Sequence, residues 1–220
     1  SFDGAWYARA RKYVKVPMGK VAYAEHGKGP VALFLHGFPL NNFQWRGAIA
    51  LLSSDRRCIA PDFLAMGHTE TPEGQSVGPE AQVAMLLALL DELAVKEFDL
   101  VASDSGGAVA QLLVARVQNR VRTLLLTNCD TEIDSPPPAF LPVIEMSKAG
   151  TFVDQGLVPQ LRDKSIVHTP QGLGGQCYSD RSNPTDEAID YYLTPLASAP
   201  LRKLHVDAYA IAVEKNPLEC

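Results

Sequence analysis

The chain has 220 residues, of which 46% are hydrophobic and 20% charged, and its net charge is -5. This length suits one domain with a substantial core, or one domain with an insertion. The mildly acidic balance argues against nucleic acid as a partner. No apolar run reaches the length of a membrane span, and we expect neither a membrane span nor a signal peptide.

The cysteines are scattered along the sequence, at Cys58, Cys129, Cys177 and Cys220. Their spacing fits neither a metal site nor a disulfide framework. Cys58 and Cys129 lie in apolar, strand-like runs, so we expect them to act as small core residues. A reducing cytoplasm is the expected location, and the sequence implies no metal or other cofactor.

Strands and helices alternate in the first part of the chain. Two strands joined by a Pro-Met-Gly turn are expected first, and a short apolar strand that ends at a His-Gly-Phe-Pro turn follows. The elements after that turn are helix, strand, long amphipathic helix, strand, helix and strand. The expected ranges are Arg11–Val16, Lys20–Glu25, Val31–Leu35, Phe43–Leu52, Arg57–Ala60, Pro79–Leu93, Phe98–Ala102, Gly106–Val117 and Val121–Thr127. The alternation predicts a mainly parallel α/β sheet with helices on both faces.

The pattern changes near Asp130, where a Ser-Pro-Pro-Pro run interrupts it. Beyond that point we expect helices at Leu141–Lys148, Asp186–Leu193 and Leu201–Val213, and no convincing strand. The sequence therefore divides into a core, residues 1–130, and a helical region, residues 131–220. This region is either a cap over an active site or a subdomain with only a packing role.

Asp104 stands at the junction between an expected strand and an expected helix. Ala102 precedes it by two positions and Gly106 follows by two, which is the small-x-nucleophile-x-Gly spacing of the nucleophile elbow in α/β-hydrolases. Aspartate is also a favoured helix N-cap, which alone would account for it. A rival register centres the turn on Ser105, but this puts Ser103 where glycine is wanted. The register therefore favours Asp104, whose carboxylate would attack carbon and form an ester with the enzyme.

Three stretches resemble the haloalkane dehalogenase and epoxide hydrolase branch of the α/β-hydrolases. They are the His-Gly-Phe-Pro turn with its following helix, residues 36–46; a Pro-Asp loop, residues 60–69; and the segment around Asp104, residues 100–108. The resemblance implies an α/β-hydrolase core with a mainly parallel sheet and a helical cap after the sixth strand. It implies that the substrate is a small apolar epoxide or alkyl halide and that water is the second reactant.

The resemblance also implies roles for individual residues. Asp104 would be the nucleophile, and a histidine-activated water would hydrolyse the resulting ester. The N–H groups of Phe38 and Ser105 would form the oxyanion hole. Tyr191 and Tyr192 are compared with the cap tyrosines that donate to an epoxide oxygen, and Trp45 is a candidate for the pocket wall. The alternative for Trp45 is a position in the core. The alternative for Tyr191 and Tyr192 is an amphipathic helix on which one tyrosine is buried and the other is exposed.

The sequence departs from this branch in ways that bear on chemistry. Haloalkane dehalogenases place Trp directly after the nucleophile, and many have Asn where this chain has Phe38; here Ser105 follows Asp104. Losing these halide ligands favours epoxides over alkyl halides as substrates.

The family histidine follows two further strands, which are expected to be missing here. His205 is expected at the surface, His36 to shape its loop and Asp62 to hydrogen-bond its own loop. The acid partner is expected after a missing strand, at Asp130, or at the uncharged Asn128.

Three functions remain open on this basis. The first is an enzyme that forms an alkyl ester on Asp104. The second is a serine esterase or lactonase that uses Ser105. The third is a non-catalytic module that binds a small apolar ligand. If the later strands are missing, the strand at Val121–Thr127 forms an exposed sheet edge, through which the chain is expected to self-associate.

Overall fold

The computed structural model describes residues 2–133 and 135–218. A six-stranded sheet lies at its centre, with the strand order β1-β2-β4-β3-β5-β6. The strands are β1 (Lys12–Val16), β2 (Gly19–His26), β3 (Val31–Leu35), β4 (Arg57–Pro61), β5 (Phe98–Asp104) and β6 (Val121–Cys129). The hairpin of β1 and β2 joins β4 antiparallel, whereas β4, β3, β5 and β6 run parallel. This arrangement confirms the expected mainly parallel sheet.

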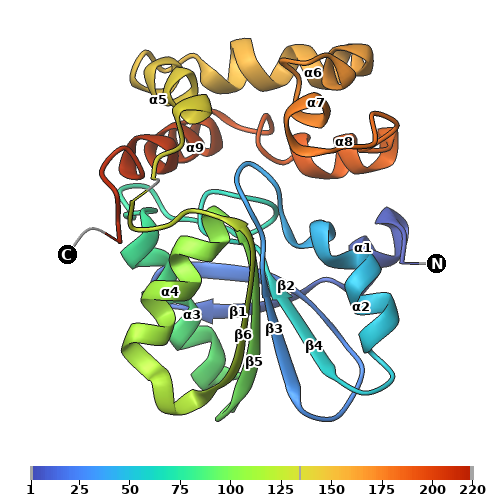
Figure 1. Ribbon diagram of the computed structural model, residues 1–220, viewed down its shortest axis with the longest axis vertical. Helices are drawn as coiled ribbons and strands as arrows, with labels where there is room; N and C mark the ends of the chain where they lie inside the picture. Colours follow the sequence, from blue (N-terminus) through green and yellow to red (C-terminus); the bar gives the residue numbers. More distant parts are fainter. Residues whose placement is uncertain (1, 134, 219–220) are drawn as a thin grey trace.

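Helices lie on both sides of the sheet. Helices α3 (Pro79–Glu92) and α4 (Ser105–Val117) cover one face, and α1 (Gly4–Ala10) and α2 (Arg46–Leu52) lie on the other side (Figure 1). The sequence did not reveal α1, a short helix whose N-cap Asp3 accepts a hydrogen bond from the N–H of Trp6. The expected helix from Phe43 begins as a 3₁₀ turn at Asn42–Trp45 and becomes α-helical only at Arg46.

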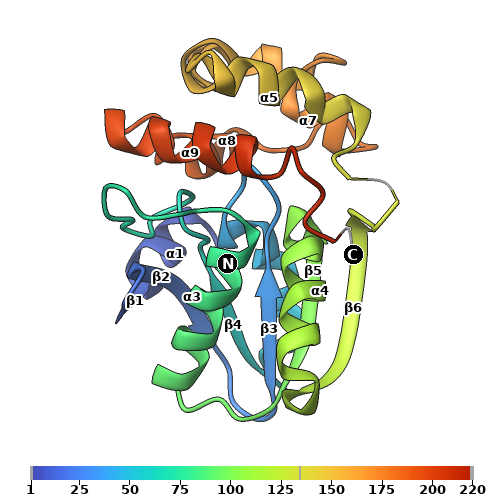
Figure 2. The ribbon, with the colours of Figure 1, turned by 90° about the vertical axis from the view of Figure 1, so that its left-hand side faces the viewer.

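The residues after β6 form helices that lie over the carboxyl ends of the parallel strands (Figures 1 and 2). These helices are α5 (Leu141–Lys148), a π-helical turn (Phe152–Leu157), α6 (Val158–Arg162), α7 (Leu173–Cys177), α8 (Asp186–Leu193) and α9 (Pro200–Ala212). The bounds of α5 and α8 match the expected ones, and α9 differs by one residue at each end. Helices α6 and α7 span five residues each and were not anticipated, because such short elements carry too little periodicity to detect.

The two strands that flank β5 differ in burial. Every residue of β3 is buried, whereas β6 stands at the end of the strand order and is exposed along most of its length. Leu124 and Leu125 of β6 are 41% and 55% exposed. Figure 2 shows β6 at the margin of the core, below the connection to the cap.

The cysteines Cys58, Cys129 and Cys177 are free thiols. Cys58 is buried as expected, Cys129 is half-buried, and Cys220 lies outside the described residues. Among residues 2–133 and 135–218, no helix has the length and apolarity needed to cross a membrane.

Candidate active site

Asp104 lies in the sharp turn between β5 and α4, with φ 56° and ψ -137°. A positive φ is uncommon for a residue other than glycine, and such strained backbone is concentrated at functional sites. The Asp104 side chain makes no capping hydrogen bond to the first turn of α4. Helix capping therefore does not account for an aspartate here.

Two glycines make room for this turn. A Cβ atom on Gly106 would lie 2.4 Å from the carbonyl oxygen of His36, which is far inside van der Waals contact. A Cβ on Gly37 would lie 2.5 Å from the Cβ of Asp104. The close approach of the β3 turn to Asp104 therefore requires glycine at both positions.

The main chain of the β3 turn contacts the carboxylate of Asp104 directly. The N–H of Phe38 donates a hydrogen bond to Oδ1 of Asp104 at 2.9 Å. The N–H of the preceding Gly37 donates to Oε1 of Gln44 at 3.0 Å, which helps to hold the turn. The second expected donor, the N–H of Ser105, belongs to the first residue of α4. The geometry thus brings Phe38 and Asp104 together as the sequence suggested.

His36 shapes the turn and is fully buried. Its Nδ1 lies 2.9 Å from the carbonyl oxygen of Gly37, and its Nε2 accepts the N–H of Phe63 at 3.0 Å. These contacts assign the neutral imidazole with the proton on Nδ1. Burial lowers the pKa of His36, which keeps this form at neutral pH. Both ring nitrogens are engaged, so the structural role expected for His36 is confirmed.

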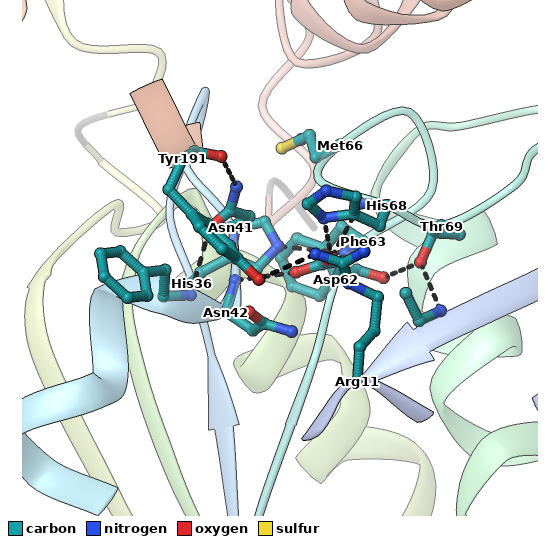
Figure 3. A network of polar contacts seen from close by, with 12 residues as sticks. Arg11, His36, Asn41, Asn42, Asp62, Phe63, Met66, His68, Thr69 and Tyr191 are labelled. Carbon is teal, nitrogen blue, oxygen red and sulfur yellow. Dashed lines mark hydrogen bonds and ion pairs between the residues drawn. The ribbon is translucent and has the colours of Figure 1, made fainter. Parts of the chain in front are cut away.

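The loop after β4 is organised around Asp62 (Figure 3). The Asp62 carboxylate accepts the N–H of His68 from its own loop and the N–H of Asn42 from the β3 turn, each at 2.8 Å. The expected bond within its own loop is therefore confirmed, and a second bond joins this loop to the turn. Asn41 extends the network to the cap by donating to the carbonyl oxygen of Tyr191 at 2.9 Å.

A small cavity of about 30 Å³ lies beside Asp104. Core residues Phe38, Asp104, Ser105 and Asp130 line one side, and Phe140 and Tyr209 of the cap region line the other. Its volume is close to that of one water molecule in the liquid. The cavity therefore lies between the nucleophile candidate and the cap, although Asp104 itself is exposed to solvent.

Tyr209 is a site residue that the sequence reasoning missed. It lies on α9, is completely buried, and stacks on the ring of Phe38 with centroids 5.3 Å apart. Its hydroxyl group is buried close to that of Ser105, which also lines the cavity. Val206 and Val213 share its face at helical spacing, so periodicity alone could have placed Tyr209 toward the core.

The pocket residues expected from the sequence lie elsewhere. Trp45 packs against Phe34 of β3, with centroids 5.4 Å apart. The hydroxyl of Tyr191 accepts a hydrogen bond from Arg11, and that of the fully buried Tyr192 accepts one from Arg46. None of these three expected residues lines the cavity at Asp104. The reason is the position of α8, which packs against α1 and the Asn42–Trp45 turn, while α9 faces Asp104.

Asp130 lies beside the cavity, as expected for an acid after β6. Its Oδ2 accepts the hydroxyl proton of Ser135 at 3.1 Å, and its main-chain carbonyl accepts the side chain of Gln111 at 3.0 Å. No histidine of the described chain lines this cavity. His205, expected at the surface, is only 7% exposed, because α9 turns it toward the core; burial lowers its pKa.

The similarity to known proteins covers this same region. Residues 30–156, more than half of the chain, match the α/β-hydrolase fold family. A haloalkane dehalogenase of Mesorhizobium japonicum is 38% identical over 117 residues, covering 52% of this chain and 38% of its own length. Epoxide hydrolase 2 of Siraitia grosvenorii is 38% identical over 104 residues, covering 46% of this chain and 33% of its own length.

The crystal structure of haloalkane dehalogenase DbeA from Bradyrhizobium elkani superimposes with a TM-score of 0.71 and 26% identity, over 94% of this chain and 69% of that chain. The chain spans less than half the length of the two curated relatives named above. Together with the sheet order and the β5–α4 turn, these matches show that the chain belongs to the α/β-hydrolase fold family.

Proposed function

We propose that this protein is a hydrolase in which Asp104 attacks a saturated, electrophilic carbon of a small apolar substrate, either an epoxide or an alkyl halide. The observation that carries the proposal is the Asp104 carboxylate itself, held in a strained strand-to-helix turn with the Phe38 N–H on Oδ1. Relatives named haloalkane dehalogenase and epoxide hydrolase support the same substrate class.

The contacts divide the two carboxylate oxygens between two tasks. Oδ1 accepts the Phe38 N–H, so Oδ2 is the oxygen that attacks. A bond forms between Oδ2 and the substrate carbon, while the bond to the leaving atom breaks and its electron pair departs with that atom. The product is an alkyl ester in which Oδ1 is the carbonyl oxygen.

Hydrolysis of this ester uses the same N–H groups. Water attacks Cγ of Asp104, and negative charge develops on Oδ1, where the N–H groups of Phe38 and Ser105 stabilise it. Activation of the water requires a base, for which the family uses a histidine, with Asp130 as the candidate acid partner. The described histidines lie outside the cavity, so the described residues supply the alkylation half of this cycle.

A serine mechanism has less support. Ser105 is the first residue of α4, and its hydroxyl oxygen is buried, whereas Asp104 occupies the strained turn position. Replacing Ser105 by Ala would abolish a serine esterase and leave the Asp104 ester chemistry possible. Replacing Asp104 by Asn would have the opposite effect.

Single turnover in heavy-oxygen water tests the proposal. Excess protein is mixed with an epoxide or a bromoalkane, and the peptide that contains Asp104 is analysed by mass spectrometry. The proposal expects either an alkyl adduct on Asp104 or heavy oxygen in its carboxylate. Label found only in the product would contradict it, and binding with no adduct, label or product would favour the ligand-binding module.

A further inference from the structure

The carbonyl oxygen of Tyr191, near the carboxyl end of α8, lacks the helical partner that such a carbonyl usually has. In a continuing α-helix it would accept the N–H of the residue four positions later. That residue is Pro195, which has no N–H. The next two N–H groups, of Leu196 and Ala197, both donate to the carbonyl of Leu193. The Tyr191 carbonyl is therefore left to a partner from outside the cap.

Asn41 of the core is that partner. Its Nδ2 donates to the Tyr191 carbonyl at 2.9 Å (Figure 3). Its Oδ1 accepts the N–H of Phe43 at 3.1 Å, so an acceptor on one side and a donor on the other fix the orientation of the amide. Asn41 is completely buried, and an unmade bond to a buried amide is costly. The amide therefore holds α8 against the turn after β3.

A short series of hydrogen bonds connects Asn41 with the N–H donor at Asp104. The carbonyl oxygen of Asn41 accepts the N–H of Gln44 at 3.0 Å. The side-chain oxygen of Gln44 accepts the N–H of Gly37, also at 3.0 Å. The next N–H along the chain is that of Phe38, which donates to Oδ1 of Asp104 at 2.9 Å. Gln44 thus ties the Gly37–Phe38 segment to the residue that carries the cap contact.

We propose that Asn41 is a positioning residue that couples the cap to the Phe38 N–H, so that the Asp104 carboxylate is held for attack only while α8 rests on the β3 turn. Asn41 does not line the cavity and acts through Gln44. The coupling is a property of the fold, while its consequence for alkylation rests on the proposed function. With the Phe38 N–H in place the carboxylate keeps one orientation, and without it fewer encounters with substrate are productive.

Two substitutions separate the hydrogen bond from the coupling. Asn41→Ser removes the amide donor but keeps a side-chain oxygen for the Phe43 N–H, since serine is also a favoured N-cap. Pro195→Ala supplies the missing N–H within α8, because Thr194 already has helical backbone angles, φ -55° and ψ -45°. In the double variant the Tyr191 carbonyl has a partner again, but that partner does not connect the cap with the β3 turn.

Amide hydrogen exchange of the whole protein, read by mass spectrometry, follows the two ends of this connection in peptides 36–45 and 186–198. Asn41→Ser should speed exchange about tenfold in both peptides, because a buried polar group loses its bond. Adding Pro195→Ala should restore slow exchange in peptide 186–198 only. Arg11→Met is the matched control, because Arg11 donates to the hydroxyl of the same Tyr191 from outside the turn. It should leave exchange in peptide 36–45 unchanged.

The same variants are then compared in single-turnover alkylation by 1,2-epoxyhexane. At saturating epoxide the rate should fall about tenfold in Asn41→Ser and stay low in the double variant. The half-saturating concentration should change by less than about twofold, because Asn41 lies outside the cavity. Arg11→Met should keep the wild-type rate.

Gln44→Met interrupts the path beyond Asn41 and keeps the cap contact, so it should speed exchange in peptide 36–45 alone. It provides the test if Asn41→Ser does not fold, and unchanged exchange in peptide 36–45 would then overturn the coupling.

Three results with Asn41→Ser would overturn the coupling. The first is normal exchange in peptide 36–45. The second is recovery of that peptide on adding Pro195→Ala, because Asn41 would then serve only to satisfy a carbonyl. The third is an equal effect of Arg11→Met on that peptide, which would assign the change to general loosening of the cap. If wild type is not alkylated at all, the proposed function fails, while hydrogen exchange still decides the coupling.

Discussion

Strands β3 and β6 are the two neighbours of β5, and they support Asp104 very differently. All of β3 is buried between β4 and β5, while β6 is exposed along most of its length. The turn after β3 contributes the Phe38 N–H to Asp104, and buried hydrogen bonds of His36 and Asp62 hold that turn. The N–H donor that contacts Asp104, the proposed nucleophile, therefore comes from the β3 side of the sheet.

The β6 side supplies less to the site. Asp130 follows this strand and lines the cavity, with Gln111 and Ser135 as hydrogen-bond partners. No histidine of the described residues accompanies it there. In the proposed mechanism, alkylation would therefore depend on the β3 side, and activation of water would be left to the β6 side.

The largest effect is expected from Asp104→Asn. A neutral amide is a poor nucleophile toward carbon, so alkylation by an epoxide should fall by about 10⁴-fold or more. The measurement is the initial rate of adduct and product formation. Asp130→Asn, on the β6 side, is the matched control and should leave the alkylation rate within about tenfold of wild type. Equal losses in the two variants would remove the distinction between the two sides.

A second prediction compares two adjacent glycines of α4. A Cβ on Gly106 would meet the His36 carbonyl at 2.4 Å, and one on Gly107 would meet Cβ of Cys129 at 2.1 Å. The first neighbour is backbone of a turn that is buried, whereas the second is a Cβ of β6, which is paired with a neighbouring strand on one side only and is therefore the less constrained of the two. Gly106→Ala should therefore lower the free energy of unfolding by about 3 kcal/mol, and Gly107→Ala by about 1 kcal/mol. Urea unfolding measures both, and the reverse order would show that β6 is the more rigid side.

The third prediction concerns acid stability on the β3 side. Since burial lowers the pKa of His36, the unfolded chain binds a proton at a higher pH than the folded chain does. Stability contributed by neutral His36 is complete above about pH 6.5 and is lost as the pH falls toward the lowered value. The free energy of unfolding should drop by about 1 kcal/mol between pH 7.5 and 5.5 on this account.

His36→Gln should reduce that pH dependence, as measured by urea unfolding at both pH values. His205→Gln is the comparison variant, because burial lowers the pKa of His205 too, yet this residue lies on α9. A full pH dependence in His36→Gln would contradict the assignment to His36.

The smallest effect is expected at the β6 edge. Leu125 is 55% exposed on the last strand of the sheet, and exposed apolar edges promote pairing with a second copy of the chain. Leu125→Lys should weaken concentration-dependent self-association in sedimentation experiments, with a change in unfolding free energy of about 0.5 kcal/mol or less. Identical sedimentation of wild type and variant at all concentrations would contradict this prediction.

The sequence predicted the sheet and the position of Asp104 because both depend on local patterns. The apolar run of β3 and the small residues around Asp104 are readable one segment at a time. The cap was less accessible, because the face that each cap helix turns toward the core is set by tertiary packing. Tyr191 and Tyr192 were therefore assigned to the pocket, while Tyr209, on the apolar face of an expected helix, was overlooked.

Peptide mapping after reaction with an epoxide tests most directly whether Asp104 is the nucleophile. One modified peptide is expected, with the new mass on Asp104, and no modification is expected in Asp104→Asn. Cys177→Ser is the control for alkylation of a thiol, because Cys177 is an exposed free cysteine. Desolvation raises the pKa of the Cys177 thiol to about 11, so little of the reactive thiolate is present at pH 7. Modification of Ser105, or turnover that persists in Asp104→Asn, would contradict the central claim.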